Sequence, residues 1–402
     1  MDVRHGRMRG DPYLAREQGS AMNAGARLLI YDTSNFEDFP LGGQLTSVKG
    51  FLRNLAEEHP DVAERTVLIG VTLDGGAVGK LGSVELFGMA FAFLPVCLAE
   101  RDQSHTRRSL RFEYAKGLLR NLGRLHLTGN DVNYIHTPEA FSFIRLRGGR
   151  RRYVFSHGSF VGMSRNLRFF SGSPVAAAFQ HYMTHVIKAA DGLFVLDRGT
   201  QAEYERLNDN VRLVGNSITY REGVKRAFDP NAVRLLFVGR FSAVKGIPAI
   251  IEAAESDARV ASLTLVGAGE LDDDLRSIPT AKVRFTGALA HDEVLDEMRH
   301  ADVLVMNSSH EGIPMTILEA LGMGLPVVTT AVGGISEVLE FGVTGESADG
   351  TAESIRRAVE RVANSYQLYS LNAYKASEQY LYTAVNERVL YALLGGEALW
   401  RA

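Results

Sequence analysis

The sequence contains little cysteine and no recognisable metal-binding spacing. Cys97 is the single cysteine among 402 residues, so the chain cannot build a disulfide framework or a cage of thiolate ligands. Its eleven histidines show no H-E-x-x-H or similar ligand spacing, and we predict no metal site. This cysteine usage is typical of the reducing cytosol, and we expect a cytoplasmic protein.

Long apolar segments are also missing. The longest apolar run, Leu86–Ala99, falls short of the ~20 residues that a membrane-spanning helix needs, and it predicts a buried strand and loop instead. Residues 1–24 are polar and lack the apolar centre of a signal peptide, so we expect a disordered lead. The sequence therefore predicts no transmembrane segment.

No excess of either charge is present, since 44 basic and 47 acidic residues leave a formal charge of -3. Such a balance gives no global field that would recruit nucleic acid or an anionic membrane. One dense basic stretch, the arginine cluster, consists of Arg145, Arg147, Arg150, Arg151 and Arg152. Two interpretations stay open: a solvated loop, which we favour, or a contact with an anionic acceptor or with lipid at the inner face of a membrane. Because no aromatic residues are interleaved with these arginines, we expect no nucleic-acid binding.

The C-terminal half alternates short apolar runs with amphipathic helical stretches. Apolar residues recur at spacings of three and four in the stretches between the runs. The predicted strands are 234–240, 262–267, 283–287, 303–308 and 326–331. Continuously apolar strands that alternate with helices predict a parallel sheet wrapped by helices.

The N-terminal half repeats this pattern less clearly. Its predicted strands are 26–34, 66–73, 132–139, 152–159 and 192–197. A polar stretch near 220–231 predicts the linker. We therefore expect an α/β fold with two Rossmann-like domains facing each other across a cleft, at 25–225 and 232–375, followed by a helical tail at 376–402. Ligands of such sheets bind beyond the carboxyl ends of the strands.

The stretch HEGIPMTILEALGMG carries two carboxylates, Glu311 and Glu319, on either side of a helix start. Pro314 suits the first helical position, because its missing N–H would have no partner there. The amides of Ile313, Met315 and Thr316 would then form an anion site favoured by the helix dipole.

The two carboxylates suit a ligand with hydroxyls on both sides of a phosphate group. Glu319 would lie roughly 7.5 Å further along the helix axis than Pro314, at ~1.5 Å per residue. Carboxylates accept hydrogen bonds from paired hydroxyls, and a nucleotide sugar has sugar hydroxyls, a diphosphate and ribose hydroxyls in that order. The alternative is that both are ordinary surface glutamates of an amphipathic helix.

A second constellation, VGRFSAVKG, places Arg240 at a strand end and Lys245 at the following helix start. Gly239 and Gly246 relieve the turn between these elements. Two cations over one phosphate-sized space would neutralise a diphosphate leaving group. The alternative is a pair of solvated side chains on a loop.

These residues together resemble glycosyltransferase family 4. The resemblance is carried by GRFSAVKG, LTLVGAGE, FTGALAHDEV and NSSHEGIPMTILEALGMGLPVVTTAVGGISEVLEFGVTG, and it runs from about Val233 to Gly345. It implies a retaining transferase with the glycosyltransferase-B fold. The family roles carry over to Arg240 and Lys245 on the diphosphate, Glu311 on the donor sugar and Glu319 on the ribose. The donor-binding segment that follows Glu311 would comprise Gly312, Ile313, Pro314, Met315 and Thr316.

The resemblance is patchy in the N-terminal half. The family has a Gly-Gly loop after the first strand, to which Gly42 and Gly43 correspond. It also has a histidine in a later strand-end loop, for which His136 is the better match and His157, at the end of the next strand, is a second candidate. By the same resemblance, the C-terminal tail would cross back onto the N-terminal domain.

The resemblance implies transfer of a sugar from a nucleotide-diphosphate sugar to a glycan, lipid or small-molecule acceptor, with the departing β-phosphate as base and without a metal or cofactor. The fragment at Gly267–Glu270 does not complete the G-x-G-x-x-G fingerprint, since position 272 is Asp, so a nicotinamide cofactor is not expected. Two alternatives stay open. One is a sugar-nucleotide epimerase or a phosphorylase on the same scaffold, and the other is a non-catalytic nucleotide-binding or scaffold protein.

Overall fold

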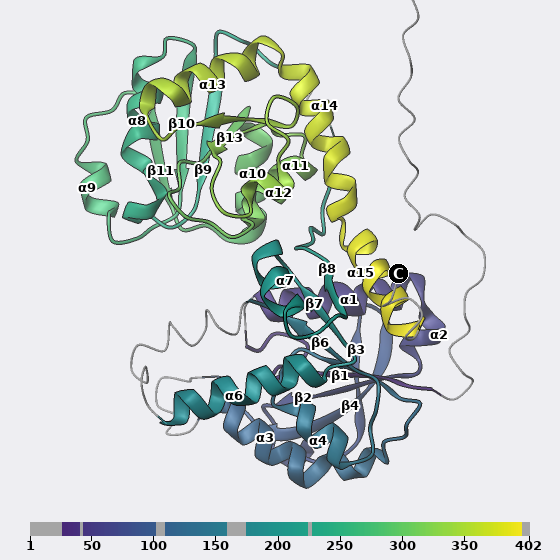
Figure 1. Cartoon of the computed structure of the whole chain (residues 1–402). Coiled ribbons are helices and arrows are strands. Elements are labelled where there is room, and N and C mark those ends of the chain that lie inside the picture. Colours follow the sequence, from purple (N-terminus) through teal and green to yellow (C-terminus); the bar gives the residue numbers. More distant parts are fainter. Residues whose placement is uncertain (1–25, 41–42, 102–108, 159–173, 224–226, 396–402) are drawn as a thin grey trace, which may run out of the picture.

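The computed structural model describes residues 26–40, 43–101, 109–158, 174–223 and 227–395. The predicted lead at 1–24 lies outside these residues. The described chain forms two separate sheets, each with helices packed on both faces, and the two units lie one above the other in Figure 1. This architecture confirms the predicted fold class.

The first sheet contains eight strands in the order β3-β4-β2-β1-β5-β6-β7-β8. All neighbours are parallel apart from the antiparallel pair β3 and β4. The strands are β1 (Leu28–Tyr31), β2 (Thr66–Thr72), β3 (Gly82–Leu86), β4 (Met89–Leu98), β5 (Val132–Ile135), β6 (Arg152–Ser156), β7 (Gly192–Val195) and β8 (Val211–Leu213). Strands β1, β2, β5 and β7 are buried along their whole length, as expected for parallel strands between two helix layers.

Helices cover both faces of this first sheet. They are α1 (Gly43–Glu58), α2 (Pro60–Ala63), α3 (Leu110–Asn121), α4 (Ala140–Leu146), α6 (Pro174–Ala189) and α7 (Arg198–Glu205). On one face Tyr114 of α3 and Phe141 of α4 pack in a cluster with Tyr31 of β1. On the other face Phe51 of α1 packs in a cluster with Ile30 of β1. The alternation of neighbouring β1 residues between the two clusters follows from the period of two in a strand.

The second sheet contains six parallel strands in the order β11-β10-β9-β12-β13-β14. They are β9 (Val233–Val238), β10 (Val260–Val266), β11 (Val283–Gly287), β12 (Val303–Val305), β13 (Val327–Thr330) and β14 (Gly345–Ala348). The helices that follow them are α8 (Ile247–Ser256), α9 (Asp272–Arg276), α10 (His291–His300), α11 (Met315–Gly322), α12 (Ile335–Val338) and α13 (Ala352–Asn364). Helices α8 and α13 belong to the core on one face, and α10, α11 and α12 to the core on the other.

The end of the chain returns to the first sheet. Helices α14 (Tyr366–Ala376) and α15 (Tyr382–Leu394) run from the C-terminal domain down to the N-terminal domain in Figure 1. Val385 and Leu393 of α15 are buried in the same cluster as α1. At the crossing, Leu381 forms a bridge with Ile218, and the Tyr382 amide donates to the Ile218 carbonyl at 2.8 Å.

Three strands are absent from the sequence-based expectation, and all three lie at sheet edges. Strands β3 and β8 are the two edges of the first sheet, and β14 is an edge of the second. An edge strand has one hydrogen-bonded neighbour and does not need a continuous apolar run. The strand predicted within 86–99 is confirmed as β4, and the loop lies before this strand, because Leu86 ends β3 and residues 87–88 form the hairpin turn.

Packing of α15 on the N-terminal domain predicts a strong stability effect at Leu393, whose side chain is fully buried. Replacing Leu393 by Ala should lower the free energy of unfolding by about 2–5 kcal/mol, because it leaves a cavity. Leu368 on α14 is 60% exposed, and Leu368→Ala serves as the matched control with a loss below about 0.5 kcal/mol. Urea unfolding measures both, and equal effects would contradict the docked helix.

Candidate functional site

The sequence-predicted site residues lie mainly at the carboxyl ends of strands, where parallel sheets bind ligands. Arg240 follows β9, and Glu311 lies in the segment between β12 and α11. In the N-terminal domain His136 follows β5, and His157 comes directly after the residue that ends β6. The two domains meet at a cavity of about 70 Å³, lined by Thr46 of α1 and by residues of α10 and α11.

The turn after β9 is fixed to the segment after β12 through Gly246. Gly246 has φ +55°, and a Cβ at this position would lie 2.5 Å from the Asn307 carbonyl oxygen. The Asn307 side-chain amide also donates to the Gly246 carbonyl at 3.1 Å. A residue larger than glycine would separate the two segments, so this contact sets the position of Lys245, the residue before Gly246.

Lys245 and Glu311 form an ion pair in this arrangement. Their side chains are 19% and 12% exposed, so the pair is partly shielded from water. The Ser308 hydroxyl donates to Glu311 Oε1 at 2.6 Å, and the Thr330 hydroxyl donates to the Ser308 carbonyl at 2.6 Å. The Glu311 carboxylate is thus held in place by a charge and by a hydrogen-bonded segment.

The Arg240 side chain, unlike that of Lys245, is not held by an ion pair among the described residues. Its side chain is exposed, and within the described part of the chain it has no hydrogen bond or ion pair. The structure therefore brings Lys245 to Glu311 and leaves Arg240 at the strand end with its donors available.

The helix after Glu311 begins later than the sequence predicts. Helix α11 starts at Met315, and Pro314 precedes it with φ -69° and ψ 128°, an extended conformation. The prediction of Pro314 as the first helical residue is therefore wrong by one position, because ψ at Pro314 is far from the helical value. The first amides of α11, at Met315 and Thr316, still lack partners within the helix.

Glu319 occupies a separate place from Glu311. It lies in the second turn of α11 and lines the small interdomain cavity with Thr46 and His291. Its Oε1 is 3.8 Å from His291 Nδ1. Burial raises the pKa of Glu319, and the His291 imidazole opposes this rise. The two glutamates thus serve different neighbourhoods, one beside Lys245 and one at the domain boundary.

Two further predicted residues of this segment have structural partners. The Asn216 side chain, before the linker, donates to the Ile313 carbonyl at 3.2 Å. A Cβ on Gly334 would lie 3.0 Å from the Gly312 carbonyl oxygen. These contacts tie the segment to the interdomain connection and to the turn after β13.

The two candidate histidines of the N-terminal domain contact each other. His136 Nδ1 and His157 Nε2 are 2.9 Å apart. The His136 ring also stacks on Phe155. Burial lowers the pKa of His157 to about 4, and burial together with the neighbouring His157 lowers the pKa of His136 well below its usual range. Both imidazoles are therefore neutral at pH 7 and act as one hydrogen-bonded pair.

The Gly-Gly loop is described only in part. Gly42 lies outside the described residues, and Gly43 is the first residue of α1. The next residue, Gln44, donates its side-chain amide to Asp32 Oδ1 at 2.9 Å. Asp32 directly follows β1 and was not predicted as a site residue. Its signal in the sequence is an acidic residue at the end of an otherwise apolar strand.

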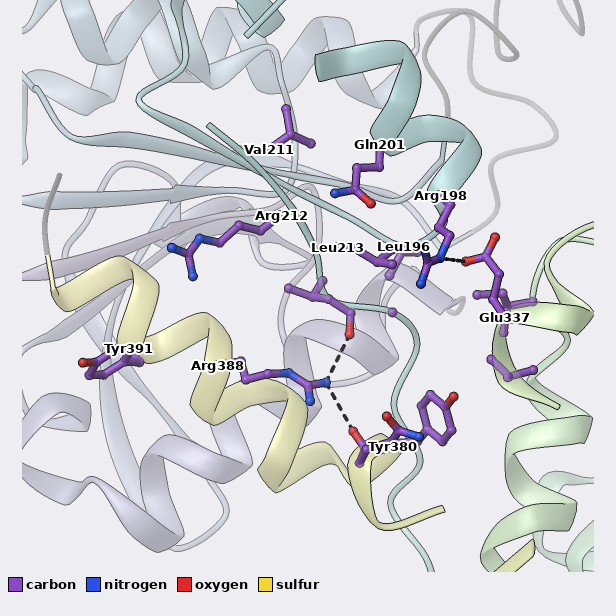
Figure 2. Close-up of a pocket in the computed structure, with 15 residues that line it drawn as sticks. Leu196, Arg198, Gln201, Val211, Arg212, Leu213, Glu337, Tyr380, Arg388 and Tyr391 are labelled. Carbon is purple, nitrogen blue, oxygen red and sulfur yellow. Dashed lines mark hydrogen bonds and ion pairs between the residues drawn. The ribbon is translucent and has the colours of Figure 1, made fainter. Parts of the chain in front are cut away.

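A larger cavity of about 630 Å³ lies between the domains beside the connecting segment (Figure 2). Arg198 of α7 reaches Glu337 of α12, with Nε and Oε2 3.6 Å apart. Arg388 of α15 donates to the Gln379 carbonyl at 3.2 Å. Ile313 is the one residue of this lining that the sequence analysis assigned to the site. We therefore place the candidate site at the strand ends and not in this cavity.

The arginine cluster lies at the amino ends of the strands of the first sheet, whereas the candidate histidines lie at the carboxyl ends. Arg152 begins β6, whereas His157 lies beyond its carboxyl end. Arg151 donates to the Leu393 carbonyl and Arg152 to the Ala189 carbonyl, both at 3.0 Å. The preceding helix α4 is on the side of this domain farthest from the C-terminal domain in Figure 1. The cluster is thus separated from the strand ends that carry the predicted site residues of this domain.

The described residues contain neither a metal-binding cluster nor a helix that could span a membrane. No group of three or more His, Cys, Asp or Glu side chains is arranged to hold a metal ion there. None of the described helices has the length and apolar character needed to cross a membrane.

Comparison with known families identifies the C-terminal domain. Residues 232–365 match the model of the family described as glycosyl transferases group 1. This range contains Arg240, Lys245, Glu311 and Glu319.

Curated relatives extend the likeness toward the N-terminal domain. The chain is 32% identical over 213 residues to the putative teichuronic acid biosynthesis glycosyltransferase TuaC of Bacillus subtilis, covering 50% of each chain. It is 28% identical over 330 residues to D-inositol 3-phosphate glycosyltransferase of Pseudarthrobacter chlorophenolicus, covering 73% of this chain and 71% of that one. The match thus spans half the length of the first relative.

Solved structures share the whole architecture. Sucrose-phosphate synthase from Thermosynechococcus elongatus superposes with a TM-score of 0.66 at 16% identity, covering 92% of this chain and 99% of that one. HepE from Anabaena, solved in complex with UDP-glucose, gives 0.58 at 18% identity, covering 91% and 99%. At these identities the likeness concerns the fold, which is the glycosyltransferase-B fold.

The backbone beside Glu311 predicts a strict requirement for glycine at position 333. Gly333 has φ +56°, and a Cβ there would lie 1.8 Å from the Glu311 carbonyl oxygen. Gly333→Ala should lower the free energy of unfolding by about 2–5 kcal/mol, from overpacking and left-handed strain together. Gly342 has φ +84° and open space around its Cβ position, so Gly342→Ala should cost only about 1–2 kcal/mol. Equal losses in denaturant unfolding would show that the contact with Glu311 does not matter.

Proposed function

We propose that the chain transfers a sugar from a nucleotide-diphosphate sugar to a hydroxyl of an acceptor, with retention of configuration. The proposal is supported by the match of residues 232–365 to the family described as glycosyl transferases group 1 and by the glycosyltransferase-B fold. The observation that carries this proposal is the Lys245–Glu311 ion pair, which lies just before α11 at the strand ends. A cation, a carboxylate and free helix amides in one place suit a sugar joined to a diphosphate.

The C-terminal domain would bind the donor. Arg240, with its available donors, and Lys245 neutralise the diphosphate, and the first amides of α11 add hydrogen bonds to it. Because Lys245 pairs with Glu311 in the structure, phosphate oxygens arriving there would share the Lys245 charge and free Glu311 to accept from sugar hydroxyls. Glu319, at the small interdomain cavity, would accept from the ribose hydroxyls.

The proposed sugar transfer needs no covalent bond between the sugar and the protein. The acceptor oxygen bonds to the anomeric carbon while the bond from that carbon to the β-phosphate oxygen breaks. The acceptor proton passes to the departing phosphate, so attack and departure occur on the same face and configuration is retained. Arg240, Lys245 and the α11 amides stabilise the charge that develops on the leaving diphosphate, and no metal ion is required for this role.

Solved neighbours suggest the class of donor to test first. The HepE structures are described as complexes with UDP-glucose and with UDP and glucose, which supports a uridine nucleotide sugar for this chain. The relatives are named for teichuronic acid biosynthesis and for an inositol phosphate, and both support a hydroxyl-bearing acceptor.

Glu311 is predicted to act in transfer more than in folding. Glu311→Gln keeps the size of the side chain but removes the charge that pairs with Lys245. We expect sugar transfer or donor hydrolysis to fall ~10²- to 10³-fold, the usual effect of removing one electrostatic group from an active site. Glu353, at the start of α13 and 55% exposed, provides the control Glu353→Gln with unchanged rates. A Glu311→Gln protein with near-normal turnover would refute the assignment.

Glu319 is predicted to act mainly in nucleotide binding. Because its side chain is 13% exposed and its pKa is raised by burial, it costs stability unless a ligand uses it. Glu319→Ala should weaken nucleotide affinity ~10- to 100-fold in calorimetry, the range for a lost hydrogen bond to a charged group. Unchanged nucleotide affinity would argue against the ribose role.

A further inference from the structure

Asp32 and His136 stand next to each other at the carboxyl edge of the first sheet. Strands β1 and β5 are parallel, with Tyr31 opposite Ile135, so the residues that follow them, Asp32 and His136, continue this register. The His136 amide donates to the Tyr31 carbonyl at 2.9 Å. Asp32 and His136 are only 2% and 4% exposed.

Each of these two side chains has a buried polar atom without a partner. Within the part of the chain that the structure describes, Asp32 Oδ2 and His136 Nε2 have no hydrogen-bond partner, and both atoms are buried. Glu139, three residues after His136, has a third such atom in Oε2. Buried polar atoms are nearly always satisfied in folded proteins, so three of them after two adjacent strands indicate a place that a ligand completes.

The remaining atoms of Asp32 and His136 are firmly held. Gln44 of α1 donates to Asp32 Oδ1, and His157 contacts His136 Nδ1. Beside them, the Thr33 amide donates to Thr137 Oγ1 at 3.1 Å. Asp32 Oδ2 and His136 Nε2 are therefore the atoms that could contact a ligand. Their side chains are held by contacts with the sheet and with α1.

Helix α1 connects this place with the donor side of the cleft. Gln44, in its first turn, contacts Asp32, while Thr46, two residues later, lines the cavity that contains Glu319. Gln44 and Thr46 both lie in the first turn of α1, so Asp32 is next to the end of α1 that lines the interdomain cavity.

We propose that Asp32 is a substrate-binding residue whose free oxygen accepts a hydrogen bond from a hydroxyl group of a sugar or polyol, with His136 contacting the same molecule. Asp32 Oδ2 can accept a hydrogen bond whether the carboxyl group is ionised or neutral, and a carbohydrate hydroxyl can donate that bond. This inference rests on the proposed function, in which such hydroxyls are present. The hydroxyl comes from the transferred sugar of the donor or from the acceptor.

The electrostatics of Asp32 agree with a role in binding. Burial raises its pKa to about 7, against the lowering effects of the Gln44 hydrogen bond and of Arg111 on α3. Burial and, to a smaller extent, the charge of Asp32 raise the pKa of Tyr114 on α3, and Glu139 pairs with Arg111 at 3.5 Å. Because the folded-state pKa lies above that of an unfolded Asp, the ionised carboxylate destabilises the fold, and this loss grows as pH rises from about 4 through about 7.

Asp32→Asn tests this directly through stability. If Asp32 served only the fold, its replacement would lower the melting temperature of the protein. We expect instead that the Asp32→Asn variant melts higher than the wild type at pH 8 and at the same temperature at pH 4. Asp131, the residue before β5, is also buried, but its carboxylate is paired with Arg27 at 2.7 Å. Asp131→Asn is the matched control and should melt lower at pH 8. If Asp32→Asn also melts lower at pH 8, the binding role is overturned.

Ligand measurements identify the source of the hydroxyl. Calorimetry compares UDP with UDP-glucose, GDP with GDP-mannose and ADP with ADP-glucose on wild type and Asp32→Asn. Loss of ~10- to 100-fold in affinity for the sugar conjugate alone assigns the donor sugar. Saturation-transfer NMR with myo-inositol and glucose, in the presence of the bound nucleotide, covers the acceptor, and loss of the transfer signal in the variant assigns it. If neither ligand class is affected, or if nucleotide alone weakens equally, the inference fails.

The outcomes also separate this inference from the proposed function. Wild-type protein that binds none of the nucleotides contradicts the proposed function, whatever Asp32 does. Wild-type protein that binds a nucleotide sugar, with an Asp32→Asn variant indistinguishable in both ligand measurements, contradicts only the role of Asp32.

Discussion

The ion pair between Lys245 and Glu311 joins the two segments on which the candidate site depends. One segment is the turn after β9, and the other is the chain between β12 and α11. Gly246 and Gly333 permit the close backbone contacts that hold this pair, because a Cβ at either position would clash with Asn307 or with Glu311. The charge arrangement is therefore a consequence of backbone packing at the carboxyl edge of a parallel sheet.

The N-terminal domain contributes a different kind of site. Its polar groups are deeply buried: burial lowers the pKa of His136 and His157, which are neutral at pH 7, and raises the pKa of Asp32 to about 7. Such an environment favours hydrogen bonds to hydroxyls, whereas the C-terminal domain places charges where a diphosphate would lie. Helices α14 and α15 connect the two domains, and in the proposed function one nucleotide sugar would span both kinds of site.

Sequence patterns predicted the C-terminal domain well for a physical reason. Four of its five predicted strands, β9, β10, β12 and β13, lie inside the sheet, where parallel strands must be continuously apolar, and β11 forms one edge. The spacing of Glu311 and Glu319 also predicted two separate neighbourhoods. The Pro314 prediction failed by one residue, because proline is accepted just before a helix as well as in its first turn.

Other features could not be read from the sequence. The edge strands β3, β8 and β14 carry little apolar signal. The contact between His136 and His157 depends on the pairing of β5 with β6, and the importance of Asp32 on the pairing of β1 with β5. The pairing of β1 with β5 joins residues more than a hundred positions apart. A local sequence pattern cannot predict such a pairing.

The most direct measurement of the central claim is a thermal-shift titration of the wild-type protein with UDP, GDP and ADP, repeated with Lys245→Ala. A ligand that binds only the folded state raises the melting temperature in proportion to the logarithm of its concentration above the dissociation constant. We expect a concentration-dependent rise with at least one nucleotide diphosphate, and a smaller rise in Lys245→Ala. No rise with any of the three, or an identical rise in the variant, would contradict a diphosphate site at Lys245 and Glu311.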